Sequence, residues 1–548
     1  MRPVTAARSG GEPAPPGPAA AKGSGSAAGV AALPAGLRIE FDQDTKQLSD
    51  GSLFGGSPAR VMRLTPAGTA ALDELRAGPV RSAPAGVLAR RLTDAGLAHP
   101  VFADTALPVT GGADSDSADP AAAARTRDRS GDHASTAAVT VIIPVRDRAA
   151  MLERCLAATG TRYPVLVVDD GSADPDTTAA IAARYGAAVR LRAANGGPAA
   201  ARNTGLAGVG TDLIAFLDSD CVPPPGWVGA LAEHFADPLV GAVAPRIVPI
   251  SNLASRPAGG LPPAARYATA FGSLDLGPRP ARVLPGSRVA YVPTAALVVR
   301  RSALDSIAAG KPPFDEALPS GEDVDLIWRL HEAGWRIRYE PSVQVPHDGP
   351  VSWAGLLERR FHYGTSAAPL ARRHPANVAP LVLHPWPAAT VAAVLARRPV
   401  AAAAGLAGAW LDLTTALRRA AIPADGTPAA ALTAAWQTWL GVGKYSTQFA
   451  APAVALALAR PGGKSASRRW GRRAAAASLL LGPALKAYAE GKPELDPVRF
   501  SLARIADDIC YGAGVWTGCL RERTLIPVMP VLSWRPLRLG GHRGNGED

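Results

Sequence analysis

Short apolar runs that alternate with helix-like stretches constrain the fold of this chain more than any other feature. From Ala138 onward, runs rich in β-branched or large apolar residues lie at 139–144, 165–168, 189–192 and 213–217. Helical patterning separates them, so the order predicts an α/β fold with a mostly parallel sheet covered by helices. Ligands in such sheets bind beyond the carboxyl ends of the strands.

Acidic residues lie where these strands are expected to end. Asp170 follows the second run, and Asp218 and Asp220 follow the fourth. A Gly/Ala-rich turn over 195–201 lets the backbone approach a ligand, and Arg202 supplies a fixed positive charge. Mg²⁺ and Mn²⁺ take carboxylate and phosphate oxygens together, so the pattern indicates a metal-bridged diphosphate.

A further acidic pair, Glu322 and Asp323, opens a later helical stretch. A carboxylate at this place can accept a proton from a hydroxyl group, and a helix N-terminus should favour its anion. Each motif also has a purely structural interpretation. Asp-Gly-Ser forms ordinary turns, 320–323 fits a helix capping box, and His347 fits a hydrogen-bonded loop histidine. The order of all these sites on one α/β pattern favours function.

As a set, Pro144, 169–172, 195–205, 218–220 and 322–323 resemble the GT-A fold of glycosyltransferase family 2, over about residues 137–365. The resemblance implies an inverting, metal-dependent transfer from a nucleotide-diphosphate sugar. It also implies a single displacement, without a covalent glycosyl-enzyme intermediate.

The resemblance assigns a role to each matched residue. Donor binding would fall to Pro144 and Asp170 at the base, Asp218 at the ribose and Arg202 nearby. Asp220 and His347 would hold Mn²⁺ or Mg²⁺, and Asp323 would be the catalytic base. Glu322 and Trp328 are the acceptor-side candidates, although a tryptophan at this helical spacing is at least as often a core residue.

Residues 36–104 form a separate unit with an expected strand–turn–helix–helix order. Through segments 53–60 and 63–68 it resembles the small winged, peptide-binding domains similar to the pyrroloquinoline-quinone chaperone. Joined to a family 2 domain, the unit resembles glycosyltransferases of the mycofactocin system. This implies transfer of glucose from UDP-glucose to the peptide-derived redox cofactor premycofactocin, as a β-1,4-linked oligoglucoside.

The net charge of +12 does not by itself indicate nucleic-acid binding, because it accompanies an Arg-rich composition. Winged domains also bind DNA, but the helix expected over 85–95 offers only Arg90 and Arg91, without Asn or Gln to read bases. We therefore expect no nucleic-acid partner. Residues 1–35 are expected to be disordered, and 105–136 to form a linker.

Beyond about residue 375 the chain becomes Ala/Leu-rich, which predicts an α-helical region over 376–548. The apolar stretch 399–417 lies between the pairs 397–398 and 418–419, all four of them arginines. Arginine pairs beside apolar segments favour the cytoplasmic side of a membrane and contact with its anionic lipids. The alternative is a set of buried Ala-rich helices in a soluble domain.

Three other functions remain open at this stage. A membrane-associated tail would also suit an enzyme that glycosylates a polyprenyl phosphate or a cell-envelope lipid. A non-catalytic peptide- or membrane-binding scaffold would keep the fold with a degenerate sugar site, but it would need no base such as Asp323. A nucleotidyltransferase would share the acidic metal site, but it gives no clear reason for that carboxylate.

Overall fold

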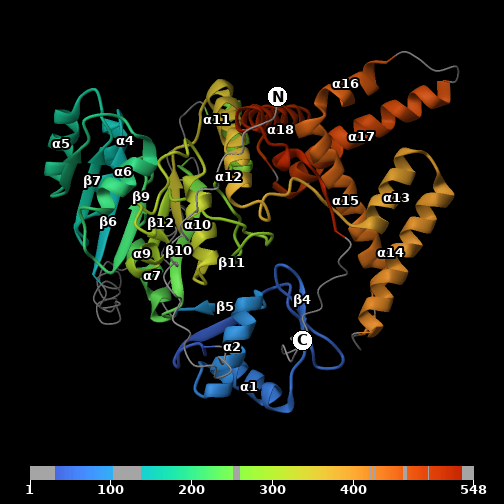
Figure 1. Cartoon of the computed structure of the whole chain (residues 1–548), viewed down its shortest axis with the longest axis horizontal. Coiled ribbons are helices and arrows are strands. Elements are labelled where there is room, and N and C mark those ends of the chain that lie inside the picture. The colour runs from blue at the N-terminus through green and yellow to red at the C-terminus, as the bar shows by residue number, and fades with distance from the viewer. Residues whose placement is uncertain are drawn as a thin grey trace, which may run out of the picture.

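The computed structural model describes most of the chain, namely residues 31–102, 138–250, 260–419, 423–424, 426–460, 466–491 and 493–533. The expected linker lies outside the described residues, and so do residues 1–30 of the segment expected to be disordered. Figure 1 shows an α/β domain, a small N-terminal unit below it and a set of C-terminal helices beside it.

Eight strands form the central sheet: β6 (Val139–Val145), β7 (Val165–Asp169), β8 (Ala188–Leu191), β9 (Leu213–Leu217), β10 (Val240–Pro249), β11 (Ala281–Val283), β12 (Ala296–Arg300) and β13 (Arg336–His347). Their order is β11-β13-β10-β12-β9-β6-β7-β8. Strands β6 to β9 pair in parallel, as predicted. β12 pairs antiparallel with β9 and β10, and β11 with β13, so the sheet is mixed, but its other strands all run in one direction and it is mostly parallel, as predicted. An apolar run predicts a strand but not its direction.

Helices bury both faces of this sheet, which explains the continuous apolar runs. The covering helices are α4 (Ala149–Thr159), α5 (Pro175–Arg184), α6 (Gly197–Leu206), α7 (Trp227–Ala232), the short 3₁₀ helix η1 (Glu233–Ala236), α9 (Arg301–Ala308) and α10 (Glu322–Glu332). Val141 and Ile143 pack on one face with α4, α5 and α7, whereas Ile142 packs on the other with α6, α9 and α10.

The N-terminal unit contains two helices and two small antiparallel sheets, formed by β1 (Arg38–Phe41), β2 (Lys46–Gln47), β3 (Leu53–Gly55), β4 (Arg60–Met62), α1 (Pro66–Ala77), α2 (Ala83–Ala95) and β5 (Ala98–Val101). Thr65 and Ser82 cap the two helices, since each side chain accepts a hydrogen bond from a backbone N–H of the first turn. Strand β5, which the sequence analysis missed, pairs with β1.

A buried ion pair joins this unit to the α/β domain. The guanidinium of Arg90 on α2 donates two hydrogen bonds, of 2.7 and 2.6 Å, to the carboxylate of Asp237. Arg338 on β13 donates a third, of 2.7 Å. Arg90 is 1% exposed, so the guanidinium that the sequence analysis considered for nucleic acid is committed to this contact instead.

The C-terminal region is helical, as predicted, and begins where the α/β domain ends. Its elements, with α8 (Pro263–Ala270) of the preceding domain, are α11 (Trp353–Thr365), α12 (Ala367–Arg373), β14 (Val382–Leu383), α13 (Pro385–Leu395), α14 (Pro399–Arg419), α15 (Thr427–Phe449), α16 (Ala451–Ala459), α17 (Ala466–Gly491), α18 (Pro497–Glu522), η3 (Ile526–Val528) and β15 (Val531–Leu532). Helix α18, in red, returns to lie beside α11 (Figure 1).

Candidate active site

The loop after β9 carries two aspartates at the carboxyl edge of the sheet. The backbone N–H of Asp218 donates to the carbonyl of Ala295 at 2.8 Å, and the N–H of Cys221 donates back to the carbonyl of Asp218 at 3.0 Å. The N–H of Asp348 donates to the carbonyl of Asp220 at 3.0 Å, which brings the end of β13 to the same place. Strand pairing and a tight turn thus fix the loop.

Asp220 and His347 meet at this edge, as the sequence analysis expected of a metal pair. His347 Nε2 lies 3.4 Å from Asp220 Oδ1, which is buried without a hydrogen-bond partner in the described structure. The other oxygen, Oδ2, accepts a hydrogen bond of 2.6 Å from Arg148. Burial alone would raise the pKa of Asp220, but His347, Arg148 and Arg359 together lower it to about 2.

These two side chains fit a divalent cation. No group of three or more His, Cys, Asp or Glu side chains suited to a metal occurs in the described part of the chain. Asp220 would supply its unpartnered Oδ1 as one ligand, and the imidazole of His347 would supply another. The remaining positions of Mn²⁺ or Mg²⁺ would go to a diphosphate and to water, which is common for Mg²⁺ at phosphate sites.

Arg202 links two of the predicted site residues. Its guanidinium donates to Asp218 Oδ1 and to Glu322 Oε1, each at 2.8 Å. Arg202 and Glu322 are buried, at 3% and 7% exposed. Glu322 is therefore a partner of Arg202, and its carboxylate positions that guanidinium, which changes the acceptor-side role expected from the sequence.

Asp170 and Pro144 line a cavity of about 500 Å³ that opens beside Asp218. The carboxylate of Asp170 accepts hydrogen bonds from the backbone N–H groups of Gly196 and Gly197, at 3.0 and 2.7 Å, and one of 2.8 Å from Arg192. Asp170 therefore holds the glycine turn in place at the cavity. Arg192, which the sequence analysis did not single out, completes this arrangement.

Asp323 lies at the start of α10 and lines a larger cavity of about 690 Å³. Burial, followed by the charge of neighbouring Glu322, raises the pKa of Asp323 to about 7. The expectation that the helix N-terminus would favour the anion of Asp323 is therefore wrong. Burial and the charge of Glu322 raise the pKa more than the N–H of Val324 and the charge of Arg202 lower it. A pKa near the working pH suits a general base.

The capping-box interpretation of 320–323 is also wrong. The N-cap of α10 is Gly321, at φ 85°, and no side chain makes a cap hydrogen bond there. A Cβ at Gly321 would lie 3.0 Å from Leu370 Cδ1 and 3.1 Å from Ser366 Cβ, so glycine suits both the backbone and the space. Glu322 pairs with Arg202, and Asp323 lines the cavity while its Oδ1 accepts a hydrogen bond of 2.8 Å from the N–H of Val324.

Trp328 contributes to the wall of the larger cavity but is a core residue in its packing. It is 5% exposed, its indole N–H donates to the carbonyl of Ala290 at 2.9 Å, and its ring lies edge-on to His374 at 5.2 Å. A face of the indole is therefore not available for stacking on a sugar, in line with the core alternative.

The larger cavity, named here the catalytic chamber, has a wall that the sequence analysis missed. Besides Asp218, Asp220 and Asp323 it is lined by side chains of α11, α12, α15 and α18. Arg148 and Arg359 also line it, near the metal pair. These residues belong to no recognisable motif, so only the packing of the C-terminal helices identifies them.

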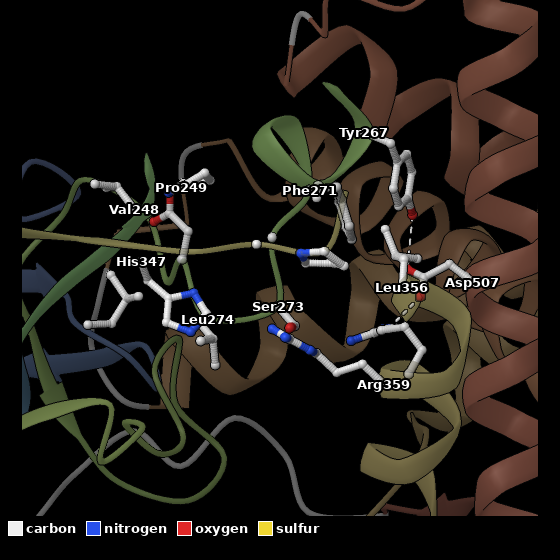
Figure 2. Close-up of a pocket in the computed structure, with 17 residues that line it drawn as sticks. Val248, Pro249, Tyr267, Phe271, Ser273, Leu274, His347, Leu356, Arg359 and Asp507 are labelled. Carbon is white, nitrogen blue, oxygen red and sulfur yellow. Dashed lines mark hydrogen bonds and ion pairs between the residues drawn. The ribbon is translucent and has the colours of Figure 1, made fainter. Parts of the chain in front are cut away.

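A smaller cavity of about 60 Å³ adjoins the chamber. Figure 2 shows its residues, with His347 on one side and Arg359 of α11 reaching in beside Ser273. At its far end the hydroxyl of Tyr267 on α8 donates to Asp507 of α18 at 2.9 Å. Helix α18 thus contacts the α/β domain at the end of this cavity away from His347.

Comparison with known proteins agrees with this geometry. The family model described as "Glycosyl transferase family 2" matches residues 140–306, which include the loop after β9 and strand β12.

The chain is also similar to curated proteins. A protein of Mycobacterium tuberculosis named "Pre-mycofactocin glycosyltransferase" is 38% identical over 513 residues, which cover 91% of this chain and 98% of that protein. An "N-acetylglucosaminyl-diphospho-decaprenol L-rhamnosyltransferase" of the same species is 31% identical, over 36% of this chain and 71% of its own.

Among solved structures, a mannosyltransferase from Pyrobaculum calidifontis in complex with GDP-Man and Mn²⁺ is 19% identical, with a TM-score of 0.32. The match covers 66% of this chain and 94% of that one.

Proposed function

Since the chain belongs to glycosyltransferase family 2, and within it to the family of the pre-mycofactocin glycosyltransferases, we propose that it transfers glucose from UDP-glucose to premycofactocin. As a member of this family it is a hexosyltransferase with the GT-A fold. Repeated transfer would build a β-1,4-linked oligoglucoside. The proposal depends most on the similarity to the M. tuberculosis protein. That similarity covers 91% of this chain and therefore extends well beyond the sheet.

The donor would lie across the two cavities at the sheet edge. Pro144 and Asp170 would contact the base in the cavity of about 500 Å³, and Asp218 would accept a hydrogen bond from the ribose. Arg202, held by Asp218 and Glu322, places positive charge beside the diphosphate.

Asp220 and His347 would hold a Mn²⁺ or Mg²⁺ ion, with the diphosphate supplying further ligands. Such an ion neutralises the negative charge that develops on the leaving diphosphate without any proton transfer. Arg148 and Arg359, both near Asp220, would add fixed positive charge on the same side.

Asp323 would be the general base. The acceptor hydroxyl oxygen bonds to the anomeric carbon while the bond from that carbon to the diphosphate oxygen breaks. The hydroxyl proton passes to the carboxylate of Asp323, and the electron pair of the broken bond leaves with UDP. Because a single displacement inverts the anomeric carbon, α-linked glucose becomes a β-glucoside.

A lipid acceptor is the second candidate, and the surface of the C-terminal helices favours it. Trp386, Trp410, Trp436 and Trp470, on α13, α14, α15 and α17, are 46%, 41%, 51% and 70% exposed. Among the described residues, α14 alone is long and apolar enough to cross a membrane. Indole rings and arginines favour the membrane interface, so these helices would lie on the cytoplasmic face of an anionic bilayer.

A direct assay tests the acceptor. Purified protein with UDP-glucose, Mn²⁺ and premycofactocin should give products that are heavier by successive hexose units in mass spectrometry. Hydrolysis of the donor without modified premycofactocin would move the acceptor to a polyprenyl phosphate or another lipid. If folded protein turned over no nucleotide sugar, a scaffold without catalysis would be the better account.

A vesicle assay tests the membrane contact separately. Co-sedimentation with phosphatidylglycerol vesicles should exceed that with phosphatidylcholine vesicles, and exchange of Trp470 and Trp436 for Ser should reduce it. Equal and weak binding to both kinds of vesicle would contradict the proposed contact.

A further inference from the structure

Most of the catalytic chamber's wall opposite the sheet lies outside the segment that matches the family model. That segment ends at residue 306, whereas α11, α15 and α18 begin at Trp353, Thr427 and Pro497. Tyr363, Lys444 and Tyr511 come from these three helices, and all line the chamber. A function limited to membrane contact would not require these helices to reach the active site.

Glycine contacts fix α18 against α11. A Cβ at Gly364 of α11 would collide with the carbonyl oxygen of Tyr511, and a Cβ at Gly514 of α18 would collide with that of Phe361. A Cβ at Gly518 would lie only 2.6 Å from the carbonyl oxygen of Thr365. The two backbones therefore touch along more than one turn, and α18 has one position relative to α11.

A buried carboxylate strengthens the same contact. Asp507 of α18 accepts hydrogen bonds from the Tyr267 hydroxyl, at 2.9 Å (Figure 2), from Arg360 of α11 and from Arg504, at 3.2 Å. Asp507 is 1% exposed, so its removal would leave two guanidinium groups without this partner. Helices α11 and α18, which line the chamber, are therefore a fixed part of the active site.

Tyrosine rings form the part of the chamber that adjoins Asp323. Tyr291 and Tyr363 line the chamber together with Asp323, and burial raises the pKa of both phenols. Burial also raises the pKa of Tyr511, whose ring lies 5.5 Å from the guanidinium carbon of Arg360. All three phenols are therefore neutral hydrogen-bond donors with apolar ring faces.

Lys444 of α15 lines the chamber beside this aromatic group. No carboxylate lies within 4 Å of its ammonium in the described part of the chain, although Asp507 and Asp508 are near enough to influence it. Its side chain reaches water through the chamber, while surrounding protein desolvates the ammonium and lowers its pKa. An ammonium without a paired carboxylate at a cavity wall can donate hydrogen bonds to a ligand oxygen.

We infer that α11, α15 and α18 bind the acceptor, with Lys444 donating to a carbonyl or hydroxyl oxygen and Tyr363 and Tyr511 contacting a ring. The ligand class is a compact cyclic molecule with one apolar ring face and several oxygen acceptors. A long aliphatic chain would leave the ammonium of Lys444 and the phenols of Tyr363 and Tyr511 without a polar ligand atom, so the chemistry favours such a ring over a polyprenyl lipid. The inference rests on the proposed function, because it places the attacking hydroxyl at Asp323.

Variants of Lys444 test the inference in the full-length protein. Lys444→Met should raise KM for premycofactocin about tenfold or more, since a hydrogen bond from a charged group contributes about 1.5–3 kcal/mol. Thermal unfolding at the wild-type temperature would show that the variant is folded. Lys444→Arg should retain part of the acceptor affinity.

Lys486→Met is the matched control. Lys486 lies on α17, outside the chamber lining, and pairs with Glu490 at 2.6 Å. This variant should keep the wild-type KM for both substrates. An unchanged acceptor KM in Lys444→Met would overturn the inference, as would an equal rise in Lys486→Met.

Calorimetric titration separates this inference from the proposed function. Wild-type protein that binds premycofactocin more tightly than Lys444→Met, but transfers no sugar to it, would refute the proposed reaction and support the site. Transfer with equal affinity in both proteins would refute the site and support the reaction. Absence of both binding and transfer would refute both.

Discussion

His347 Nε2 lies 3.4 Å from Asp220 Oδ1, the carboxylate oxygen that lacks a hydrogen-bond partner in the described structure. Since both atoms suit a divalent cation, loss of either should weaken metal binding. His347→Ala should raise the Mn²⁺ concentration needed for half-maximal transfer about tenfold, because loss of one ligand or its support costs about 10–100-fold in affinity. A Mn²⁺ titration of the initial rate measures this. Full activity in excess chelator would contradict the assignment.

The pH dependence of transfer should report the raised pKa of Asp323. Because the base must be ionised to accept a proton and its pKa is about 7, kcat/KM should fall about tenfold for each pH unit well below 7. Initial rates between about pH 5 and about pH 9, taken at saturating donor and low acceptor, measure the profile. A profile that is flat through pH 7 would contradict the role.

Glu322 provides a second check on the same pKa. Its charge raises the pKa of Asp323, so Glu322→Gln should shift the acid limb of the profile to lower pH. The variant also removes one of the two carboxylates that pair with Arg202, whose charge lowers the pKa of Asp323. Both effects lower that pKa. A shift of the limb to higher pH would show that the electrostatic account is wrong.

Close packing of α11 on α18 should make Gly514 intolerant of a side chain. Gly514→Ala places a Cβ against the carbonyl of Phe361 and should cost about 1–3 kcal/mol of folding free energy, the usual range for overpacking. Thermal or denaturant unfolding measures the loss. Gly210→Ala is the control, since no atom lies within 4 Å of its added Cβ, and equal effects in both variants would refute the explanation.

The N-terminal unit should depend on Asp237 for its attachment. Asp237→Ala removes the partner of two buried guanidinium groups, Arg90 and Arg338, and should cost about 3–5 kcal/mol. Limited proteolysis and thermal unfolding report the loss. Asp73→Ala, which removes an exposed pair with Arg76 at 4.0 Å, should change stability by less than about 1 kcal/mol. Comparable losses in both would contradict the predicted attachment.

The strand ends were predictable because local pattern and local chemistry coincide there. Strand β9 has the predicted bounds, Leu213–Leu217, and Asp218 and Asp220 follow it directly. Buried strands need continuous apolar runs, and the acids can follow only where the strands emerge. The contact of Asp220 with His347 was predictable only from the family resemblance, because no spacing in the sequence indicates that β9 and β13 end side by side.

Other features depend on three-dimensional packing and were not predictable. The antiparallel direction of β12 follows from how the chain returns to the sheet, not from the residues Ala296–Arg300 themselves. The net pKa of Asp323 depends on burial that the helix start alone does not reveal. Lys444 and Tyr511 join the site only because α18 packs on α11 and α15 packs on α18.

One comparison tests the central claim most directly: transfer from UDP-glucose to premycofactocin by wild-type protein and by Asp323→Asn, followed by mass spectrometry, with donor affinity measured in parallel. The account predicts hexose additions by the wild type, unchanged donor affinity in the variant, and a transfer rate about 10²–10⁴-fold lower, the usual contribution of a general base. Transfer by Asp323→Asn at the wild-type rate would contradict it.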